Sequence, residues 1–244
     1  SDEDERLLLL TGATGSYPHG VVGDRIEAQS VTMVSTKPRV QVVWTAPLPD
    51  GDVLEGISPI WTDLDGDGTR KILITVSNSR LVARQVVLND AGDPVAFGPA
   101  VGRGSHWRHQ LAAAPFGPSG ELEVVDVVTP HICGTVEFYR LEEDILRVVA
   151  KVPGFRTHAI GSRNLDMAVA GDFDSDGRLE LLVPSQGMDE IRAIRRTEAG
   201  AEVAWVLPID GKVSTNLAAV TTDTGGLMLG LGTDDGVLLV WPGP

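Results

Sequence analysis

The most informative segment of the chain is Ala170-Gly-Asp-Phe-Asp-Ser-Asp-Gly177, which leads directly into Arg178-Leu-Glu-Leu-Leu-Val183. An acidic turn that ends in glycine is thus followed by a short apolar run, a pattern typical of a turn that opens a β-strand. The segment Trp61-Thr-Asp-Leu-Asp-Gly-Asp-Gly68, followed by Thr69-Arg-Lys-Ile-Leu-Ile74, has the same layout. This recurrence indicates an internal repeat.

Weaker copies of the pattern occur elsewhere in the chain. One places the turn 114–120 before the strand 121–125, and another places the turn 221–226 before the strand 227–231. The aligned glycines of the four copies, at positions 68, 120, 177 and 226, are 52, 57 and 49 residues apart. A fifth, shortened copy begins the chain, because 6–10 matches 178–182 and 41–44 matches 202–205.

Each complete copy is predicted to form four short strands, which in the best copy span 166–170, 179–183, 190–195 and 202–206. Four strands in a unit of this length are typical of β-propeller blades, which stack around an axis because one blade cannot bury its own faces. We therefore predict an all-β fold, a single β-propeller domain over 1–244 with about five blades, at approximately 1–53, 54–106, 107–161, 162–212 and 213–244. A β-sandwich is the alternative.

The first and last blades are expected to be incomplete, since the first copy lacks its opening strand and the last lacks its closing strand. A closed ring leaves no long strand edge bare. We therefore expect these two copies to lie side by side, with 7–10 near 237–240, and an oligomer to be unnecessary. The alternative is an open arc that continues into further residues or pairs with a second molecule.

Charge and composition exclude several classes of protein. Asp and Glu number 34 and Lys and Arg 20, so the net charge of −14 disfavours non-specific binding to nucleic acid or anionic lipid. No apolar run approaches the roughly 20 residues of a membrane span, and no signal peptide is evident. The only cysteine, Cys133, excludes an internal disulfide and a cysteine-based zinc cluster. Acidic clusters suit a calcium-rich exterior, so we expect an extracytoplasmic location, secreted or at the cell surface.

The acidic loop 172–180 has the spacing of a calcium ligand set. Asp172, Asp174, Asp176 and Glu180 place side-chain oxygens at positions 1, 3, 5 and 9, and the carbonyl of Arg178 would supply position 7. Calcium is a hard cation that takes six to eight oxygen ligands, and Gly177 at position 6 permits the sharp turn. An EF-hand would need Glu at position 12, where this chain has Val183 inside a predicted strand. The loop is therefore predicted to lie within a β-hairpin.

These loops resemble the FG-GAP and VCBS repeats of integrin-α-like β-propellers, which carry Asp-x-Asp-x-Asp-Gly-x-x-Asp/Glu between the first two strands of a blade. The repeat covers nearly the whole chain, but the full calcium motif occurs once. The resemblance implies a Ca²⁺ cofactor that stabilises the hairpin and takes no part in chemistry.

The loop 63–71 departs from this pattern. It offers Asp63, Asp65 and Asp67, but Lys71 stands at position 9. An ammonium group there removes one ligand and adds positive charge, so this loop is expected to bind calcium weakly, or Lys71 to pair with Asp63 or Asp65. A plain Asp-Gly turn without an ion is the alternative for both loops.

The resemblance also implies that between-blade loops and the loops joining second to third strands share one face, away from the calcium loops. All five histidines fall in such loops: His106, His109 and His158 in or beside between-blade connections, and His19 and His131 in second-to-third-strand loops. The same loops carry Tyr17, Glu55, Asn78, Arg80, Trp107, Arg108, Arg163, Asn164, Gln186 and Asp189. Converging polar and aromatic groups at the mouth of a propeller are the default ligand site.

From this face we expect ligand binding by Trp107, Arg108, Arg163, Asn164, His19 and His131, with Trp107 stacking on a sugar. Histidines in loops are often only solvated, which is the alternative. A transition-metal site made by some of His106, His109, His131 and His158 is a further option, because imidazole suits zinc, copper or nickel.

Catalysis has weaker support, since the motifs of serine hydrolases, zinc proteases and nucleotide-binding loops are absent. Cys133 lies near His131, but strand alternation favours a buried small residue over a nucleophile. Candidates for catalysis are His106, His109, His131, His158, Arg108 and Tyr17. We expect a calcium-stabilised binding domain for carbohydrate or protein. A carbohydrate-active lyase or dehydratase, or a purely structural module of a larger surface protein, are the alternatives.

Overall fold

Short runs of β-branched residues and leucine alternate along the chain with turns rich in Gly, Asp, Ser and Pro, so the backbone breaks into strands of two to eleven residues. In the computed structural model, residues 5–20, 23, 25–102, 106–132, 134–159, 162, 164–223 and 225–242 are described. These residues form strands and turns without a helix, so the predicted all-β class is confirmed. A helix able to cross a membrane is accordingly not found among them.

The chain divides into two compact units. The first comprises Ser1–Arg108 together with Leu141–Arg147, and the second comprises His109–Arg140 together with Val148–Pro244.

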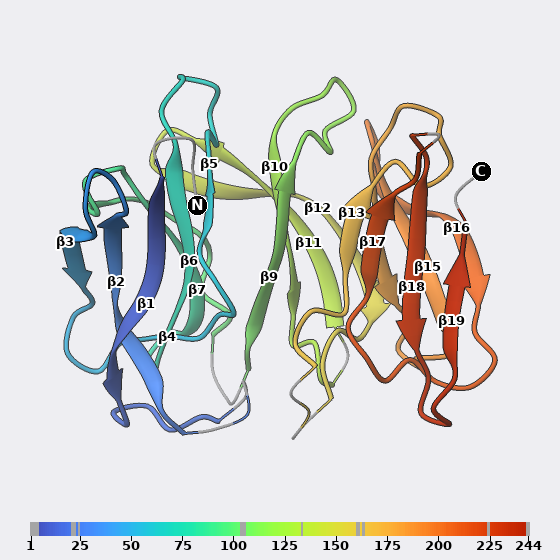
Figure 1. Cartoon of the computed structure of the whole chain (residues 1–244), viewed down its shortest axis with the longest axis horizontal. Coiled ribbons are helices and arrows are strands. Elements are labelled where there is room, and N and C mark those ends of the chain that lie inside the picture. Colours follow the sequence, from blue (N-terminus) through green and yellow to red (C-terminus); the bar gives the residue numbers. More distant parts are fainter. Residues whose placement is uncertain are drawn as a thin grey trace. The chain divides into compact units, whose positions relative to one another are not determined.

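The first unit is built around one antiparallel sheet (Figure 1). Its main strands are β1 (Arg6–Thr14), β2 (Glu27–Ser35), β3 (Gln41–Pro47), β4 (Val53–Leu54), β5 (Ile60–Thr62), β6 (Lys71–Asn78), β7 (Val82–Leu88) and β8 (Pro94–Phe97). They pair in the order β1-β2-β4-β6-β7-β8, with β3 on β2 and β5 on β6. The two-residue strand β4 joins groups that the sequence predicted as separate blades, because Leu54 lies opposite both Ala28 and Val76.

The core of the first unit lies on β2 and β6. Val31 and Met33 of β2 and Ile72 of β6 are fully buried, and Ile74 is 2% exposed. Nearly every residue of β6 is buried, so both faces of this strand are covered. The acidic loop 63–68 is therefore anchored at the start of a rigid strand.

The second unit contains three groups of antiparallel strands (Figure 1). They are β9 (Arg108–Ala114), β10 (Glu123–Val128), β11 (Gly134–Glu142) and β12 (Ile145–Phe155); β13 (Val169–Gly171), β14 (Glu180–Pro184), β15 (Glu190–Thr197) and β16 (Gly200–Pro208); and β17 (Ala218–Thr221), β18 (Leu227–Gly232) and β19 (Leu238–Trp241). Within each group, strands adjacent in sequence are hydrogen-bonded neighbours, as expected for blades connected by hairpins.

Strand β14 connects two cores of the second unit. Leu181 and Val183 pack in one cluster with residues such as Phe138, whereas Leu182 packs in another with Leu229. Successive side chains of a strand point to opposite faces, and all five residues of β14 are buried, so both of its faces are covered. The acidic loop 172–177 thus precedes a strand that is covered on both sides.

Candidate functional site

The loop between β13 and β14 is shaped by its own aspartates. The Asp172 carboxylate accepts hydrogen bonds from the amides of Asp176, at 3.1 Å, and of Gly177, at 2.9 Å. Asp176 Oδ1 accepts the amide of Arg178 at 2.9 Å. Gly177 has a φ of 84°, a left-handed conformation that glycine adopts without strain, as its place in the motif predicts.

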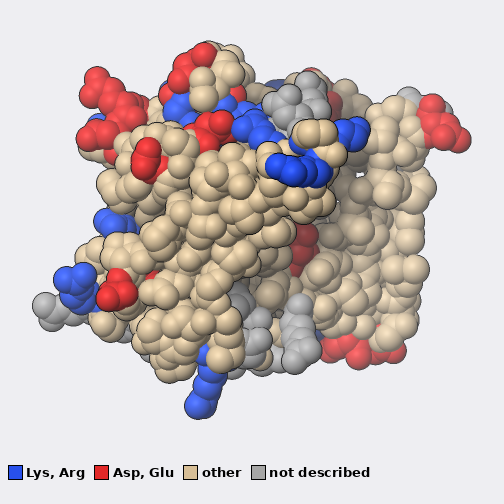
Figure 2. Space-filling view, turned by 60° about the vertical axis from the view of Figure 1, so that its left-hand side comes forward, with Lys and Arg blue, Asp and Glu red and all other residues tan. Residues whose placement is uncertain are grey.

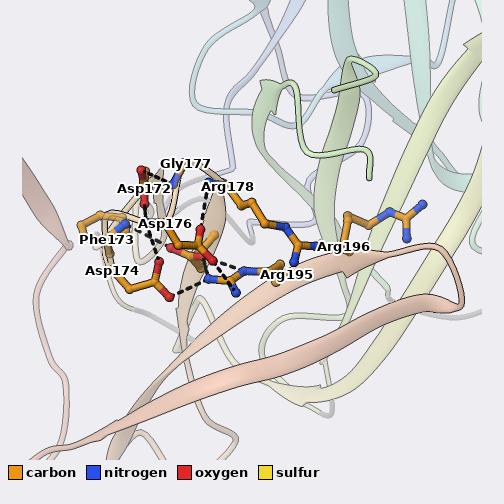
Figure 3. A network of polar contacts seen from close by, with 9 residues as sticks. Asp172, Phe173, Asp174, Asp176, Gly177, Arg178, Arg195 and Arg196 are labelled. Atoms are coloured by element: carbon orange, nitrogen blue, oxygen red, sulfur yellow. Dashed lines mark hydrogen bonds and ion pairs between the residues drawn. The ribbon is translucent and has the colours of Figure 1, made fainter. Parts of the chain in front are cut away.

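The carboxylates of this loop converge. One oxygen from each of Asp172, Asp174 and Asp176 lies within 4.8 Å of the others, and Figure 3 shows these side chains gathered at the head of the hairpin. Three converging carboxylates on a tight turn fit a hard divalent cation, which prefers oxygen ligands. The fourth expected ligand, Glu180, is outside this group: its Oε2 accepts the amide of Phe173 at 3.0 Å.

A cation of the protein itself reaches these acids from the neighbouring strand. Arg195 pairs through Nη2 with Asp174 Oδ2 at 2.6 Å and through Nη1 with Asp176 Oδ2 at 3.0 Å. Its Nε donates to Glu180 Oε1 at 2.8 Å. Glu180 and Arg195 lie directly opposite each other in the β14–β15 ladder, so the register of the hairpin creates this contact.

Burial and pairing act on these groups in opposite directions. Burial raises the pKa of the fully buried Glu180, and the hydrogen bond from Arg195 opposes this rise. Burial lowers the pKa of Arg195, but its hydrogen bonds to Glu180 and Asp174 outweigh burial and raise it. The guanidinium therefore stays charged beside three carboxylates and balances part of their negative charge.

The loop 63–71 has the same turn but a different internal cation. Asp63 accepts the amides of Gly66 and Gly68, both at 2.9 Å, and Gly68 has the same φ as Gly177, 84°. Lys71 Nζ pairs with Asp65 Oδ1 at 2.5 Å and Asp67 Oδ2 at 2.9 Å. The expected pairing of Lys71 is thus found with Asp65, while Asp63 is occupied by backbone amides.

In the first unit, a histidine is oriented by a buried carboxylate. His19 Nδ1 lies 2.9 Å from Glu55 Oε1, and Glu55 is fully buried. The Tyr17 ring lies 5.6 Å from the His19 ring, centroid to centroid. The hydrogen bond to Glu55 raises the pKa of His19 against the lowering effect of burial, and burial followed by the charge of Glu55 raises the pKa of Tyr17. A carboxylate-held imidazole beside a phenol is suited to proton transfer.

Two residues expected to line a ligand site are buried instead. Trp107 is fully buried and its Nε1 donates to the carbonyl of Glu55 at 2.9 Å, so the expected stacking on a sugar ring is wrong for this geometry. Arg108 is 2% exposed. Trp107 directly precedes β9 and Arg108 is its first residue, and their predicted loop position concealed this burial.

The remaining histidines are distributed over both units. His106 belongs to the first unit and is half-buried, while His109, His131 and His158 belong to the second. His109 is 1% exposed and lies 3.1 Å from Thr157 Oγ1. Burial, with the charge of His158, lowers the pKa of His109 to about 3, so this imidazole is neutral. Among the described residues, three metal-ligating atoms come together only in the acidic loops, so the histidines of the second unit do not assemble the expected transition-metal site.

Other polar residues of the predicted ligand face make hydrogen bonds within the protein. Asn164 Nδ2 donates to the Ser214 carbonyl, and Asn78 Nδ2 donates to Asp52 at 2.8 Å. Gln186 donates to the Ile132 carbonyl. Arg163 and Cys133 lie outside the described residues.

Sequence reasoning did not find Arg195 as part of the acidic site. The signal was present, because the predicted strands 179–183 and 190–195 set a hairpin register that brings Glu180 opposite Arg195.

In Figure 2, Lys and Arg side chains lie in small groups, several of them beside Asp and Glu, and no broad basic patch covers the face shown.

Comparisons with known proteins bear on the fold. No family model matches the chain, and no curated protein matches it. Among solved structures, the Dos1 propeller aligns over 90% of this chain and 55% of its own, with a TM-score of 0.55 and 10% identity. The exotype rhamnogalacturonan lyase YesX aligns over 96% and 52%, with a TM-score of 0.51 and 12% identity. A protein of unknown function from Bacteroides caccae aligns over 96% and 68%, with a TM-score of 0.45 and 16% identity.

The chain therefore spans between about half and about two thirds of the length of these proteins. At such identities a structural likeness establishes the fold and nothing about activity. The fold is similar to that of β-propellers.

Proposed function

We propose that this chain is a five-bladed β-propeller, related to the FG-GAP and VCBS repeat proteins, that calcium stabilises and that binds carbohydrate or protein outside the cytoplasm. The strands support five blades, because they fall into consecutive groups of three, four, four, four and three, with β4 as an additional bridge. The groups with three strands are the first and the last, where the repeat pattern predicts missing strands.

The convergence of Asp172, Asp174 and Asp176 carries the calcium proposal. The residues fit the ion, since the loop gathers three carboxylates on one turn, and calcium would compete there with Arg195 for Asp174 and Asp176. Asp172, Asp174, Asp176, Glu180 and the carbonyl of Arg178 would hold it. Bound calcium would fix the β13–β14 hairpin and leave the chemistry of binding to other surfaces.

Calorimetry with calcium and thermal unfolding with and without a chelator test this proposal. An ion that binds only the folded state raises stability by about 2.7 kcal/mol at a free concentration 100 times its Kd. We expect Asp174→Ala to lower the melting temperature in calcium and to abolish the effect of chelation. Asp223→Ala, in the degenerate copy 221–226, is the control and should leave the chelator effect intact. A wild-type protein that takes up no calcium at millimolar concentration would contradict the proposal.

The second candidate function is that of a carbohydrate lyase or dehydratase, which the Tyr17, His19 and Glu55 arrangement favours. Neutral His19 would accept the proton alpha to a carboxylate or carbonyl, while the electron pair forms the double bond and the C–O bond to the leaving group breaks. Tyr17 would give that leaving oxygen its proton.

Ultraviolet absorbance of the unsaturated product tests this reaction on acidic polysaccharides. We expect His19→Asn to abolish the product and Glu55→Gln to displace the pH profile to lower pH, because loss of the carboxylate lowers the pKa of His19. A wild-type protein that yields no unsaturated product from pectic or uronate-containing polymers would rule out the lyase and leave the binding domain.

A further inference from the structure

A pocket of about 310 Å³ lies in the second unit, between the turn 115–120 and the turn 177–179. Its size is at the lower end of the range for small-molecule sites. Its walls combine apolar side chains with two guanidinium groups, and they include Pro115, Phe116, Pro118, Leu179, Arg178 and Arg195. An apolar enclosure with few charged groups is the usual composition of a ligand site.

The two arginines of this pocket differ in how their charge is balanced. Arg195 is already paired with Asp174, Asp176 and Glu180. Arg178 donates from Nη2 to the carbonyl of Arg196 at 2.8 Å, and within the described residues it makes no ion pair with a carboxylate. Figure 3 shows the Arg178 side chain extended toward Arg196, away from the acidic group. Arg178 thus brings a positioned guanidinium to the pocket with its charge unneutralised.

Backbone amides around the pocket are largely occupied. Gly117 donates to the Glu121 carbonyl at 3.0 Å, Gly120 to the Gly117 carbonyl at 2.8 Å, and Ser119 to the Glu121 carboxylate at 2.9 Å. On the other side, the amides of Gly177 and Arg178 are taken by Asp172 and Asp176. A phosphate site needs several converging amides, which these turns do not offer. A carboxylate needs only a planar guanidinium with which to form paired hydrogen bonds.

We propose that this pocket binds the carboxylate of an acidic sugar through Arg178, with the apolar walls at Phe116 and Leu179 against the carbon face of the ring. The proposal rests on the carbohydrate-binding function proposed above and adds to it a substrate class and a location. The location is separate from the His19 cluster, which belongs to the other unit. Glu121 lies near the turn 115–120, and its negative charge is balanced by Arg140, which pairs with it at 3.4 Å. The repulsion between Glu121 and an anion in the pocket is therefore reduced.

Calorimetric titration with sodium glucuronate and with glucose tests the assignment, because the two sugars differ only at C6, where glucuronate has a carboxylate and glucose a hydroxymethyl group. All titrations contain EDTA, so that no cation can bridge the sugar to the acidic loop. We expect glucuronate to bind at least about tenfold more tightly than glucose, and Arg178→Gln to remove that difference, since hydrogen bonds between charged groups are the strong ones. Arg178→Lys should give an intermediate affinity, because it keeps the charge and loses the paired geometry.

Arg192→Gln is the matched control, because Arg192 lies on β15 and is paired with Glu190 at 2.8 Å. It should bind glucuronate as the wild type does. Arg178→Gln keeps the carbonyl of residue 178, so it removes no proposed calcium ligand, and an unchanged melting temperature will establish that it folds. Equal affinity for the two sugars, or undiminished glucuronate binding by Arg178→Gln, would overturn the proposal.

The Arg178 side-chain signal in nitrogen-15 NMR distinguishes binding at the Arg178 pocket from carbohydrate binding elsewhere on the protein. Oligosaccharides that bind while this signal stays unmoved would overturn the pocket and leave carbohydrate binding standing. Glucuronate that moves the signal, in a protein that binds no oligosaccharide, would support the pocket and count against a polysaccharide as the partner.

Discussion

Lys71 and Arg195 each place a positive charge among the carboxylates of an acidic loop, but they come from different sequence positions. Lys71 occupies the ninth position of its own loop, whereas Arg195 reaches its loop from the opposing strand of the hairpin. The loop 63–71 therefore lacks a ninth-position oxygen, while the loop 172–180 retains Glu180. This difference predicts unequal calcium affinities for two turns with nearly the same backbone hydrogen bonds.

Replacement of Lys71 by glutamate tests that reasoning. Lys71→Glu removes the competing ammonium and restores an oxygen at the ninth position, so we expect an additional or tighter calcium site at 63–71. Lys71→Met is the control, because it removes the charge without supplying the ligand, and it should give a smaller gain. Calorimetry that finds no new or tighter site in Lys71→Glu would contradict the alignment of the two loops.

The pair of His19 and Glu55 predicts a pH dependence of stability. Because the folded-state pKa of His19 is raised, chiefly by its hydrogen bond to Glu55, the folded protein binds a proton more tightly than the unfolded chain. The stabilisation is complete below the unfolded pKa, about 6.5, and is lost as pH rises through the folded value. Besides Glu55, Tyr17 and Glu27 face His19 among the residues that the structure describes.

We therefore expect the difference in melting temperature between wild type and His19→Gln to be largest below pH 6 and to shrink with rising pH. Titration of the His19 ring signal by NMR should give a pKa above that of the same residue in Glu55→Gln. A His19 pKa that does not respond to Glu55→Gln would remove the basis of the prediction.

At the scale of strands, the best copy of the repeat was predicted closely. The predicted strands 179–183, 190–195 and 202–206 correspond to β14, β15 and β16 with ends that differ by at most two residues, and 166–170 overlaps β13. Short runs rich in Val, Leu and Ile between turns of Gly, Asp, Ser and Pro made this prediction possible. The strand β4 was missed, because two residues carry no periodicity and its pairing depends on β2 and β6 in space.

Side-chain burial was the part of the site that local sequence could not predict. Trp107 and His109 sit where the pattern predicts connecting loops, yet both are buried, because β9 begins at Arg108. The acidic turns were predicted correctly, since their geometry arises from contacts within a few residues. Contacts over longer separations, such as Glu123 with Arg196, leave no local pattern.

The ion pair between Glu123 of β10 and Arg196 of β15 joins two strand groups of the second unit. Arg196 Nε lies 2.8 Å from Glu123 Oε2, and both side chains are buried. We expect Glu123→Ala to lower the free energy of unfolding by about 3–5 kcal/mol, because it leaves the guanidinium buried without its counter-charge. Chemical denaturation measures this value.

The exposed Glu198→Ala is the control for that measurement and should change stability by less than about 0.5 kcal/mol. A double variant, Glu123→Ala with Arg196→Met, should recover part of the loss, since both charges are then gone. A double variant as unstable as the sum of the single ones would show that the pair is not coupled.

At the scale of the whole molecule, closure of the ring by the first and last copies stays a prediction. Each terminal sheet on its own exposes apolar side chains: Val42 of β3 is 63% exposed, and Leu238 and Val240 of β19 are 72% and 51% exposed. Pairing of the terminal copies would cover such surface and leave the chain a monomer.

Cysteines introduced at Leu9 and Leu238, in a Cys133→Ser background, test ring closure by disulfide formation. We expect a cross-link within one chain and a monomeric mass by light scattering. Cross-linked dimers without the internal product would refute closure and favour association between chains. Cysteines at Leu9 and Val95 serve as the control for non-specific oxidation.

The guanidinium of Arg195 also bears on when this chain can fold. A hairpin whose carboxylates repel one another would form only after a cation had bound and balanced their charge. Here the balancing charge belongs to the neighbouring strand and arrives with the hairpin itself, as soon as β15 pairs with β14. If the proposed calcium site is correct, folding of the hairpin does not depend on the ion, because the register of two strands supplies the balancing charge. A chain made where free calcium is scarce would then complete this hairpin first and bind calcium afterwards.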